Sequence, residues 1–226
     1  MLCGIVVDPK ERSEHRRFLA TLLWSTAATK GVCLSMVKLV SSSANTNVLA
    51  QHISLWGDRK CICPAELNLF LRVFASGTLE EQRTAVQRLS FIRSRPARRV
   101  LIDILNDTAA PLEVRECATE MLHLHANRET AEACAKALDD EVASIRFWAA
   151  YTLGQIPVFR KSLRELALDD TAVALGWWSV GREAQAMIAN LRGNGDKERL
   201  QAEIHSVRQD PSASAGNHRW AECYGL

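Results

Sequence analysis

Apolar residues recur at helical spacing through the middle of the chain. Counting from Ile145, they lie at offsets 0, 3, 4, 7, 8 and 11, which share one face of an α-helix. The residues at these offsets are Ile145, Trp148, Ala149, Thr152, Leu153 and Ile156. The pattern predicts a helix that buries this face, with Trp148 filling a position between helices.

The same offsets recur in three further places. Copies that start at Val114 and Val180 each keep the apolar face with at most one polar residue, and a weaker copy from Glu81 keeps Ala85, Leu89 and Ile92. The starting positions are 33, 31 and 35 residues apart, a spacing typical of helical-repeat arrays.

A second helix is predicted before each copy. Asp or Asn residues follow a leucine at 105–107, 138–140 and 168–170, and such residues favour turns and helix caps. Apolar residues at helical spacing precede these turns. The repeating unit is therefore two helices and a turn, and the expected fold is an all-α, right-handed solenoid of about four helix pairs.

The second helix of the unit carries a family resemblance. Asp140, residues 142–146, Ala149, Ala150, Leu153 and Gly154 follow a pattern of roughly V-R-x-x-A-A-x-A-L-G, and Leu112 to Arg115 with Ala118 and Leu122 give the next-best copy. This pattern resembles the HEAT-like repeat of bacterial scaffold proteins and phycobilisome lyases, over about residues 65–191. Gln82 and Gly181 depart from it in the slots of Arg115 and Arg146. The resemblance implies a solenoid with an internal polar ladder that includes Arg115 and Arg146, and it names no reaction.

Three regions are expected along the chain. Residues 1–64 are predicted to form a divergent N-terminal helical cap, residues 65–192 the HEAT-like array, and residues 193–226 a capping helix and a flexible tail. Because the tail is expected to be peripheral, Trp220→Ala is predicted to cost little stability, whereas Trp148→Ala in the array is predicted to cost much more.

Composition indicates a soluble protein. The chain has 226 residues, a net charge of +2 and 47% hydrophobic residues, which offers little net field for attracting a polyanion. Seven irregularly spaced cysteines are typical of buried thiols in a reducing compartment. The apolar stretch Phe18 to Val40 contains Lys30 and Lys38, which argues against a membrane span, and the short apolar start argues against a signal peptide. We therefore expect a cytoplasmic location and no membrane partner.

Two other features have residue types found in binding sites. His52, Cys61 and Cys63 have ligand chemistry for zinc, but their spacing differs from that of structural zinc sites, so neither a metal nor another cofactor is expected. The arginine-rich stretch from Arg83 to Arg99 is either a phosphate-binding ridge or a solvated turn between helices, and we favour the turn.

Local pairs of residues suggest structural roles. Asp140 is positioned to pair with Arg146 through two hydrogen bonds and tie neighbouring repeats together. His123 and His125 point to different sides of their helix, so a structural role is favoured over a ligand pair. One of Trp177 and Trp178 is expected to be buried and the other to remain partly exposed.

Function is expected to reside on the concave layer of second helices. Residues at offsets 2, 6 and 10 of each copy are expected to face the groove of this layer. The partner-binding residues predicted from these offsets are Arg83, Gln87, Phe91, Glu116, Glu120, Phe147, Tyr151 and Arg182. Mixed charges with an aromatic pair suit a protein or peptide partner better than a phosphate backbone. Burial of Phe147 and Tyr151 against a neighbouring helix is the alternative. We expect a non-catalytic scaffold or adaptor with no catalytic residues.

An enzymatic function is the alternative to this scaffold. Some HEAT-like proteins resemble DNA glycosylases for alkylated bases, which would make nucleic acid the partner, and the chain has matching ingredients in Trp148, Trp177, Trp178, Asp170 and Arg182. Attachment of a bilin chromophore rests on the repeat resemblance alone.

Overall fold

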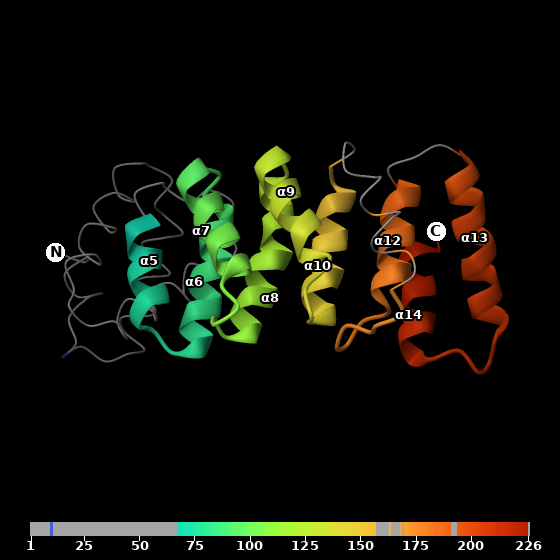
Figure 1. Ribbon diagram of the computed structural model, residues 1–226. Helices are drawn as coiled ribbons and strands as arrows, with labels where there is room; N and C mark the ends of the chain where they lie inside the picture. Colours follow the sequence, from blue (N-terminus) through green and yellow to red (C-terminus); the bar gives the residue numbers. More distant parts are fainter. Residues whose placement is uncertain are drawn as a thin grey trace. The chain divides into compact units, whose positions relative to one another are not determined.

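The computed structural model describes residues 10, 67–156, 163, 168, 170–190 and 194–225. Within these ranges the chain forms nine α-helices and one 3-10 helix, and its β-structure is limited to an isolated bridge between Val173 and Ser179. The predicted all-α class is confirmed for this part of the chain (Figure 1). The expected N-terminal cap over 1–64 lies almost wholly outside the described residues.

The helices follow one another along the chain, as the hydrophobic pattern predicts. In chain order they are α5 (Leu67–Ser76), α6 (Leu79–Phe91), α7 (Arg95–Asn106), α8 (Leu112–Met121), the 3-10 helix η2 (Leu122–His125), α9 (Arg128–Ala137), α10 (Ala143–Gly154), α12 (Val180–Asn190), α13 (Asn194–Gln209) and α14 (Ala215–Tyr224). The four copies of the apolar pattern fall on α6, on α8 with η2, on α10 and on α12.

The chain divides into two compact units. Residues 1–101 with 111–117 belong to the first unit, and residues 102–110 with 118–226 to the second. In the first unit α5 and α6 pack against each other, with Phe70 and Val73 of α5 and Leu89 of α6 fully buried. Thr78 begins α6 with a capping box, in which its hydroxyl accepts from the Glu81 amide and its own amide donates to the Glu81 carboxylate.

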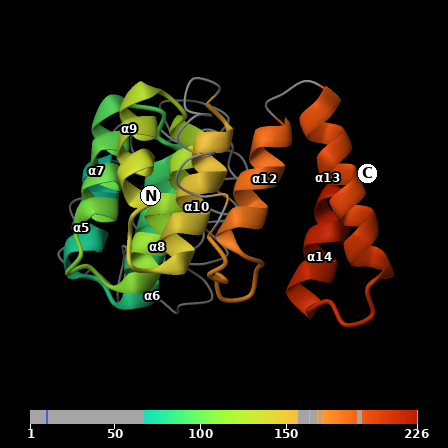
Figure 2. The same cartoon turned by 45° about the vertical axis from the view of Figure 1, so that its right-hand side comes forward.

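The second unit is built around α10. This helix packs against α9, η2 and α12, and α12 in turn packs against α13 (Figure 2). Ile145, Ala149 and Leu153 are fully buried, as predicted. Trp148 is only partly buried, whereas its neighbour Phe147 is 1% exposed. The prediction that Trp148 lies in the core is therefore wrong. Because α10 is surrounded on several sides, the buried set extends beyond the predicted stripe.

Close approach of α10 and α12 depends on Gly154. A Cβ atom added there would lie 2.4 Å from Met187 Cβ, well inside van der Waals contact. Across the other side of α10, the Thr152 hydroxyl donates to the Thr119 backbone carbonyl at 3.4 Å. Small residues on α10 therefore let its neighbours pack tightly against it.

The C-terminal segment forms a helical hairpin, in which α13 lies where a capping helix was expected and α14 lies where a flexible tail was expected. Helices α13 and α14 pack together, and Ser214 caps α14 by accepting from the Asn217 amide. Trp220 of α14 is 0% exposed, and its indole Nε1 donates to the Arg182 carbonyl at 3.2 Å. The expectation that Trp220 is peripheral is wrong, since this indole anchors α14 on α12.

None of the helices in the described part of the chain combines the length and the apolar character that crossing a membrane requires.

Candidate functional site

Six aromatic side chains of the second unit meet around one pocket, which we call the aromatic pocket. They are Phe147, Trp148 and Tyr151 of α10, Trp177 and Trp178 of the loop before α12, and Tyr224 of α14. Neighbouring ring centroids lie between 5.2 and 5.9 Å apart, mostly edge to face, which is a favourable aromatic geometry.

The pocket has a volume of about 330 Å³, at the small end of ligand-binding pockets. Its remaining lining residues are Glu120, His123, Glu183 and Cys223. The described residues that line it include two carboxylates and neither lysine nor arginine. The pocket is therefore both aromatic and acidic.

Exposure varies strongly around this pocket. Phe147 and Glu183 are each 1% exposed, and Trp178 is also buried. Trp177, by contrast, is 39% exposed, while Trp148 and Tyr151 are half-buried. The expectation that one of the paired tryptophans is buried and the other partly exposed is confirmed. A ligand can thus reach the exposed rings while the buried groups set the electrostatics beneath them.

Glu183 is the buried charge of the aromatic pocket. Its Oε2 accepts a hydrogen bond of 2.7 Å from Trp178 Nε1, and its Oε1 accepts one of 2.8 Å from the Tyr224 hydroxyl. Burial raises the pKa of Glu183 to about 7, and the two hydrogen bonds hold it below what burial alone would give. This carboxyl group therefore changes charge near neutral pH.

The hydrogen-bond network determines where the proton of Glu183 can sit. An indole N–H can only donate, so Oε2 must remain an acceptor in both protonation states. The Tyr224 hydroxyl can donate or accept, so Oε1 can carry the proton while the tyrosine reverses its role. Both charge states are thus compatible with the same heavy-atom arrangement.

A second carboxylate, on another helix, also lines the pocket. Helix α8 supplies Glu120, and His123 Nδ1 donates to the backbone carbonyl of this residue. The His123 ring meets the Tyr151 ring edge-on, with centroids 5.4 Å apart. Burial, followed by the charges of Glu183 and Glu120, raises the pKa of Tyr151. The Tyr151 phenol therefore lies in a negative potential produced by both carboxylates.

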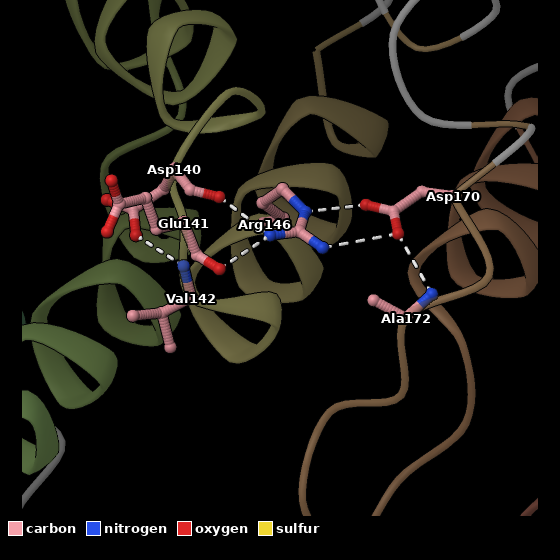
Figure 3. Close-up of polar contacts among 6 residues, drawn as sticks. All are labelled: Asp140, Glu141, Val142, Arg146, Asp170 and Ala172. Carbon is pink, nitrogen blue, oxygen red and sulfur yellow. Dashed lines mark hydrogen bonds and ion pairs between the residues drawn. The ribbon is translucent and has the colours of Figure 1, made fainter.

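The loop that carries Trp177 and Trp178 is fixed at its base by Arg146. The Arg146 guanidinium pairs with both oxygens of Asp170, through Nε at 2.6 Å and Nη2 at 3.3 Å (Figure 3). Asp170 Oδ1 also accepts from the Ala172 amide at 3.0 Å. The sequence predicted Asp140 as the bidentate partner, but in the structure the backbone carbonyl of Asp140 accepts from Arg146 Nη1, at 2.7 Å. The bidentate carboxylate is therefore Asp170, while the charge of Asp140 also helps to raise the pKa of Arg146.

The tip of this loop is held by its own turn and by α14. Trp177 donates its amide to the Ala174 carbonyl at 2.9 Å, and Gly176 between them has a φ of 82°, which favours glycine. Gly216 packs against the same tip, where an added Cβ would lie 2.6 Å from the Trp177 carbonyl oxygen. The position of Trp177 therefore depends on α14.

The predicted partner-binding residues fall into separate places. Glu120, Phe147 and Tyr151 line the aromatic pocket, although Phe147 is buried there. Arg182 instead lines a second pocket of the same unit, about 310 Å³ in volume, and places its Cζ 4.5 Å from the centre of the Trp220 ring. The other predicted residues belong to the first unit, where α6 exposes Arg83, Gln87 and Phe91 and α8 partly exposes Glu116.

The residues considered for a glycosylase are only partly brought together. Trp148, Trp177 and Trp178 all line the aromatic pocket, whereas Asp170 and Arg182 line the second pocket. Asp170 is engaged there in its ion pair with Arg146.

Sequence reasoning missed the buried acid of the site. Glu183 occupies offset 3 of the copy that starts at Val180, where the pattern calls for an apolar residue. A carboxylate on a buried face is a signal of function, because burying a charge is costly. Tyr224, by contrast, lies in a segment without any repeat pattern and could not have been assigned to this site.

Metal binding finds no support among the described residues, which contain no group of three or more His, Cys, Asp or Glu side chains suited to an ion. His52, Cys61 and Cys63 lie outside the described ranges.

No protein-family model matches the chain, and no curated protein matches it either.

Proposed function

We propose that this chain is a non-catalytic HEAT-like repeat scaffold, a right-handed array of helix pairs that binds a protein or peptide partner. The observation that carries the proposal is the aromatic pocket, with the partly exposed Trp177 beside buried Glu183. Partly exposed tryptophan and tyrosine rings around a recess are typical of the residues that dominate binding energy at protein interfaces.

The loop around the pocket adds apolar contact surface. Leu175 is 95% exposed and Val173 is also exposed, on the same loop as Trp177. Exposed large apolar side chains that lie close together mark interaction sites on soluble proteins. A partner that covers this loop would bury them together with the Trp177 ring.

The glycosylase alternative has one observation in its favour, the gathering of Trp148, Trp177 and Trp178 around an acidic recess. Nucleic acid binding depends on Lys and Arg contacts to phosphates, and the described residues that line the aromatic pocket include none. Its proposed acid and arginine, Asp170 and Arg182, line a different pocket. We therefore favour a protein partner.

Affinity capture from a lysate of the source cells tests the proposal. The purified full chain is compared with the double variant Tyr151→Ala/Trp177→Ala, which removes two accessible rings. Arg128→Ala is the control, because Arg128 is highly exposed and lies outside the aromatic pocket. The wild type and the control should recover the same proteins, and the double variant should lose them.

Two results would contradict the scaffold proposal. The first is a double variant that folds, as judged by circular dichroism, and still recovers every protein that the wild type recovers. The second is recovery of nucleic acid in place of protein, with retention that falls steeply as salt is raised.

A further inference from the structure

We propose that the aromatic pocket takes a quaternary ammonium group, supplied by a trimethylated lysine side chain of the protein partner. The inference rests on the proposed function, since it specifies the chemical group that the partner inserts. It is carried by three features of the pocket: its ring lining, its charge and the hydrogen bonds already made within it.

The ring lining suits a bulky organic cation. Trp148, Trp177 and Tyr151 are the accessible rings, and Phe147 and Trp178 close the recess beneath them. The faces of aromatic rings carry negative potential, and cages of several rings bind quaternary ammonium groups through cation–π attraction. Edge-to-face contacts set the Trp148 and Trp177 rings 78° apart, so the two indoles form walls of different orientation.

Charge in the aromatic pocket selects for a cation. Glu120 from α8 and Glu183 from α12 line the pocket, and the described lining residues include neither lysine nor arginine. An anionic ligand would meet two carboxylates at close range. A cationic ligand gains from both, and the gain is larger in a partly desolvated recess than in water.

The hydrogen bonds inside the pocket favour an alkylated cation over a bare ammonium. A lysine ammonium brings three N–H donors that need acceptors, whereas a trimethylammonium group brings none. Glu183 already accepts from Trp178 at Oε2 and from Tyr224 at Oε1. A trimethylammonium group therefore keeps the charge attraction without competing for these oxygens. It is also less costly to dehydrate than a lysine ammonium.

The surroundings of the pocket favour a side chain that is attached to a polypeptide. The recess of about 330 Å³ has room for a single side chain, and the apolar residues Val173 and Leu175 are exposed on the same loop as Trp177. A peptide could lay neighbouring apolar residues on this loop while it inserts one cationic side chain. A small free cation would leave the loop uncovered.

A titration with matched ligands tests the inference on the purified full chain. The probes are acetyl-trimethyllysine methylamide, its neutral isostere with a tert-butyl carbon in place of the trimethylated nitrogen, the unmethylated lysine derivative, choline and the cationic nucleoside 7-methylguanosine. Binding is followed by tryptophan fluorescence and by NMR shifts. The trimethyllysine probe should bind about tenfold more tightly than its neutral isostere, as expected for a desolvated cation–π site.

Variants connect binding to the named residues. Trp177→Ala and Glu120→Gln should each weaken the trimethyllysine probe several-fold, and Arg128→Ala should leave it unchanged. Glu120→Gln keeps the shape of the side chain, so its effect reports charge.

The outcomes separate this inference from the proposed function. Equal binding of the neutral isostere, or no saturable binding of the trimethyllysine probe at millimolar concentration, overturns the inference. The scaffold proposal would still stand if the capture experiment depends on Tyr151 and Trp177. Choline that binds as tightly as the trimethyllysine probe overturns the assignment to a polypeptide side chain. Preferential binding of 7-methylguanosine overturns the inference in favour of a nucleic-acid ligand.

Discussion

The indole Nε1 of Trp178 donates a hydrogen bond of 2.7 Å to Oε2 of Glu183 in the interior of the second unit. This contact joins a loop tryptophan to a carboxyl group on the first turn of α12, and Tyr224 completes the arrangement from α14. Because Glu183 is buried and its pKa is raised to about 7, the pair couples the integrity of the fold to pH.

Stability should fall as pH rises from about 4.5 to about 7. In the folded protein Glu183 keeps its proton up to about pH 7, while in the unfolded chain it ionises near the ordinary glutamate pKa of 4.5. The folded state therefore binds more protons in this window, and the free energy of unfolding decreases with pH. At the acidic end of the window the folded protein buries Glu183 in its neutral form, which favours the folded state.

The variant Glu183→Gln should remove this part of the pH dependence. Its amide can accept from Trp178 and donate to Tyr224, so the network is retained without a titrating group. Urea unfolding at several pH values measures the difference, which should reach roughly 3 kcal/mol at most between the two ends of the window. A wild type and variant with parallel pH profiles would show that Glu183 does not titrate in this range.

Binding of the trimethyllysine probe should strengthen as pH rises towards 7 and level off above it. The cation favours ionised Glu183, so binding below this pH must displace a proton. Calorimetry in two buffers of different ionisation enthalpy would detect the released proton. His123→Gln is the control, because it removes the imidazole that lines the same pocket and leaves Glu183 in place. Affinity that is independent of pH in both proteins would argue against coupling to Glu183.

Trp220→Ala should destabilise the protein by about 3 to 5 kcal/mol, the usual cost of truncating a buried tryptophan. The side chain is 0% exposed and lies under the Arg182 guanidinium, so its loss leaves a cavity between α12 and α14. Trp177→Ala is the matched control, because Trp177 is 39% exposed and should cost much less. Thermal melting compares the two variants, and equal shifts would contradict the assigned packing of α14.

Asp170→Asn should destabilise the second unit by about 1 to 3 kcal/mol, because it removes the carboxylate charge that pairs with Arg146. Both side chains of the pair are 16% exposed, so water replaces the lost contact poorly. The same variant should loosen the Trp177 loop, since the carboxylate also holds the Ala172 amide. Denaturant titration and amide exchange at residues 171–179 measure the two effects. An unchanged exchange pattern would show that the ion pair does not hold the loop in place.

Gly216→Ala should disturb the aromatic pocket more than it disturbs the fold. The added methyl group would meet the Trp177 carbonyl oxygen at 2.6 Å, which forces the loop or α14 to move. Gly154→Ala provides a comparison at a close helix contact outside the pocket lining. Weakened binding of the trimethyllysine probe with near-normal melting is expected for Gly216→Ala only. Loss of binding in both variants would indicate a general effect of destabilisation.

The helices were predictable because each carries an apolar face at a fixed spacing. Ala85 and Leu89 of α6 and Ala149 and Leu153 of α10 are buried as the pattern requires. Trp148 was assigned to the core and is only partly buried, whereas Phe147 is buried, which was the alternative to its exposure in the groove. The reason is that α10 is enclosed by η2, α9 and α12, so no single stripe describes its buried surface. Periodicity identifies one buried face and fails where a helix has several.

The candidate site was only partly predictable. Glu120 and Tyr151 were chosen from their offsets, and both line the aromatic pocket. Tyr224 reaches the same pocket from a segment 73 residues beyond Tyr151, through the docking of α14 on α12. Such long-range contacts depend on tertiary packing, for which a single sequence without repeats in its last part offers no rule.

The position of α14 has a consequence for synthesis of the protein. The indoles of Trp177 and Trp178 leave the ribosome well before Tyr224 and Trp220, so a growing chain carries the loop before its supporting helix exists. During this interval the carboxyl group of Glu183 has no phenol to bind it, and the floor of the recess is open to water. Ligand capture should therefore begin only after α14 has been translated and docked, which makes the recess a reporter of α14 docking.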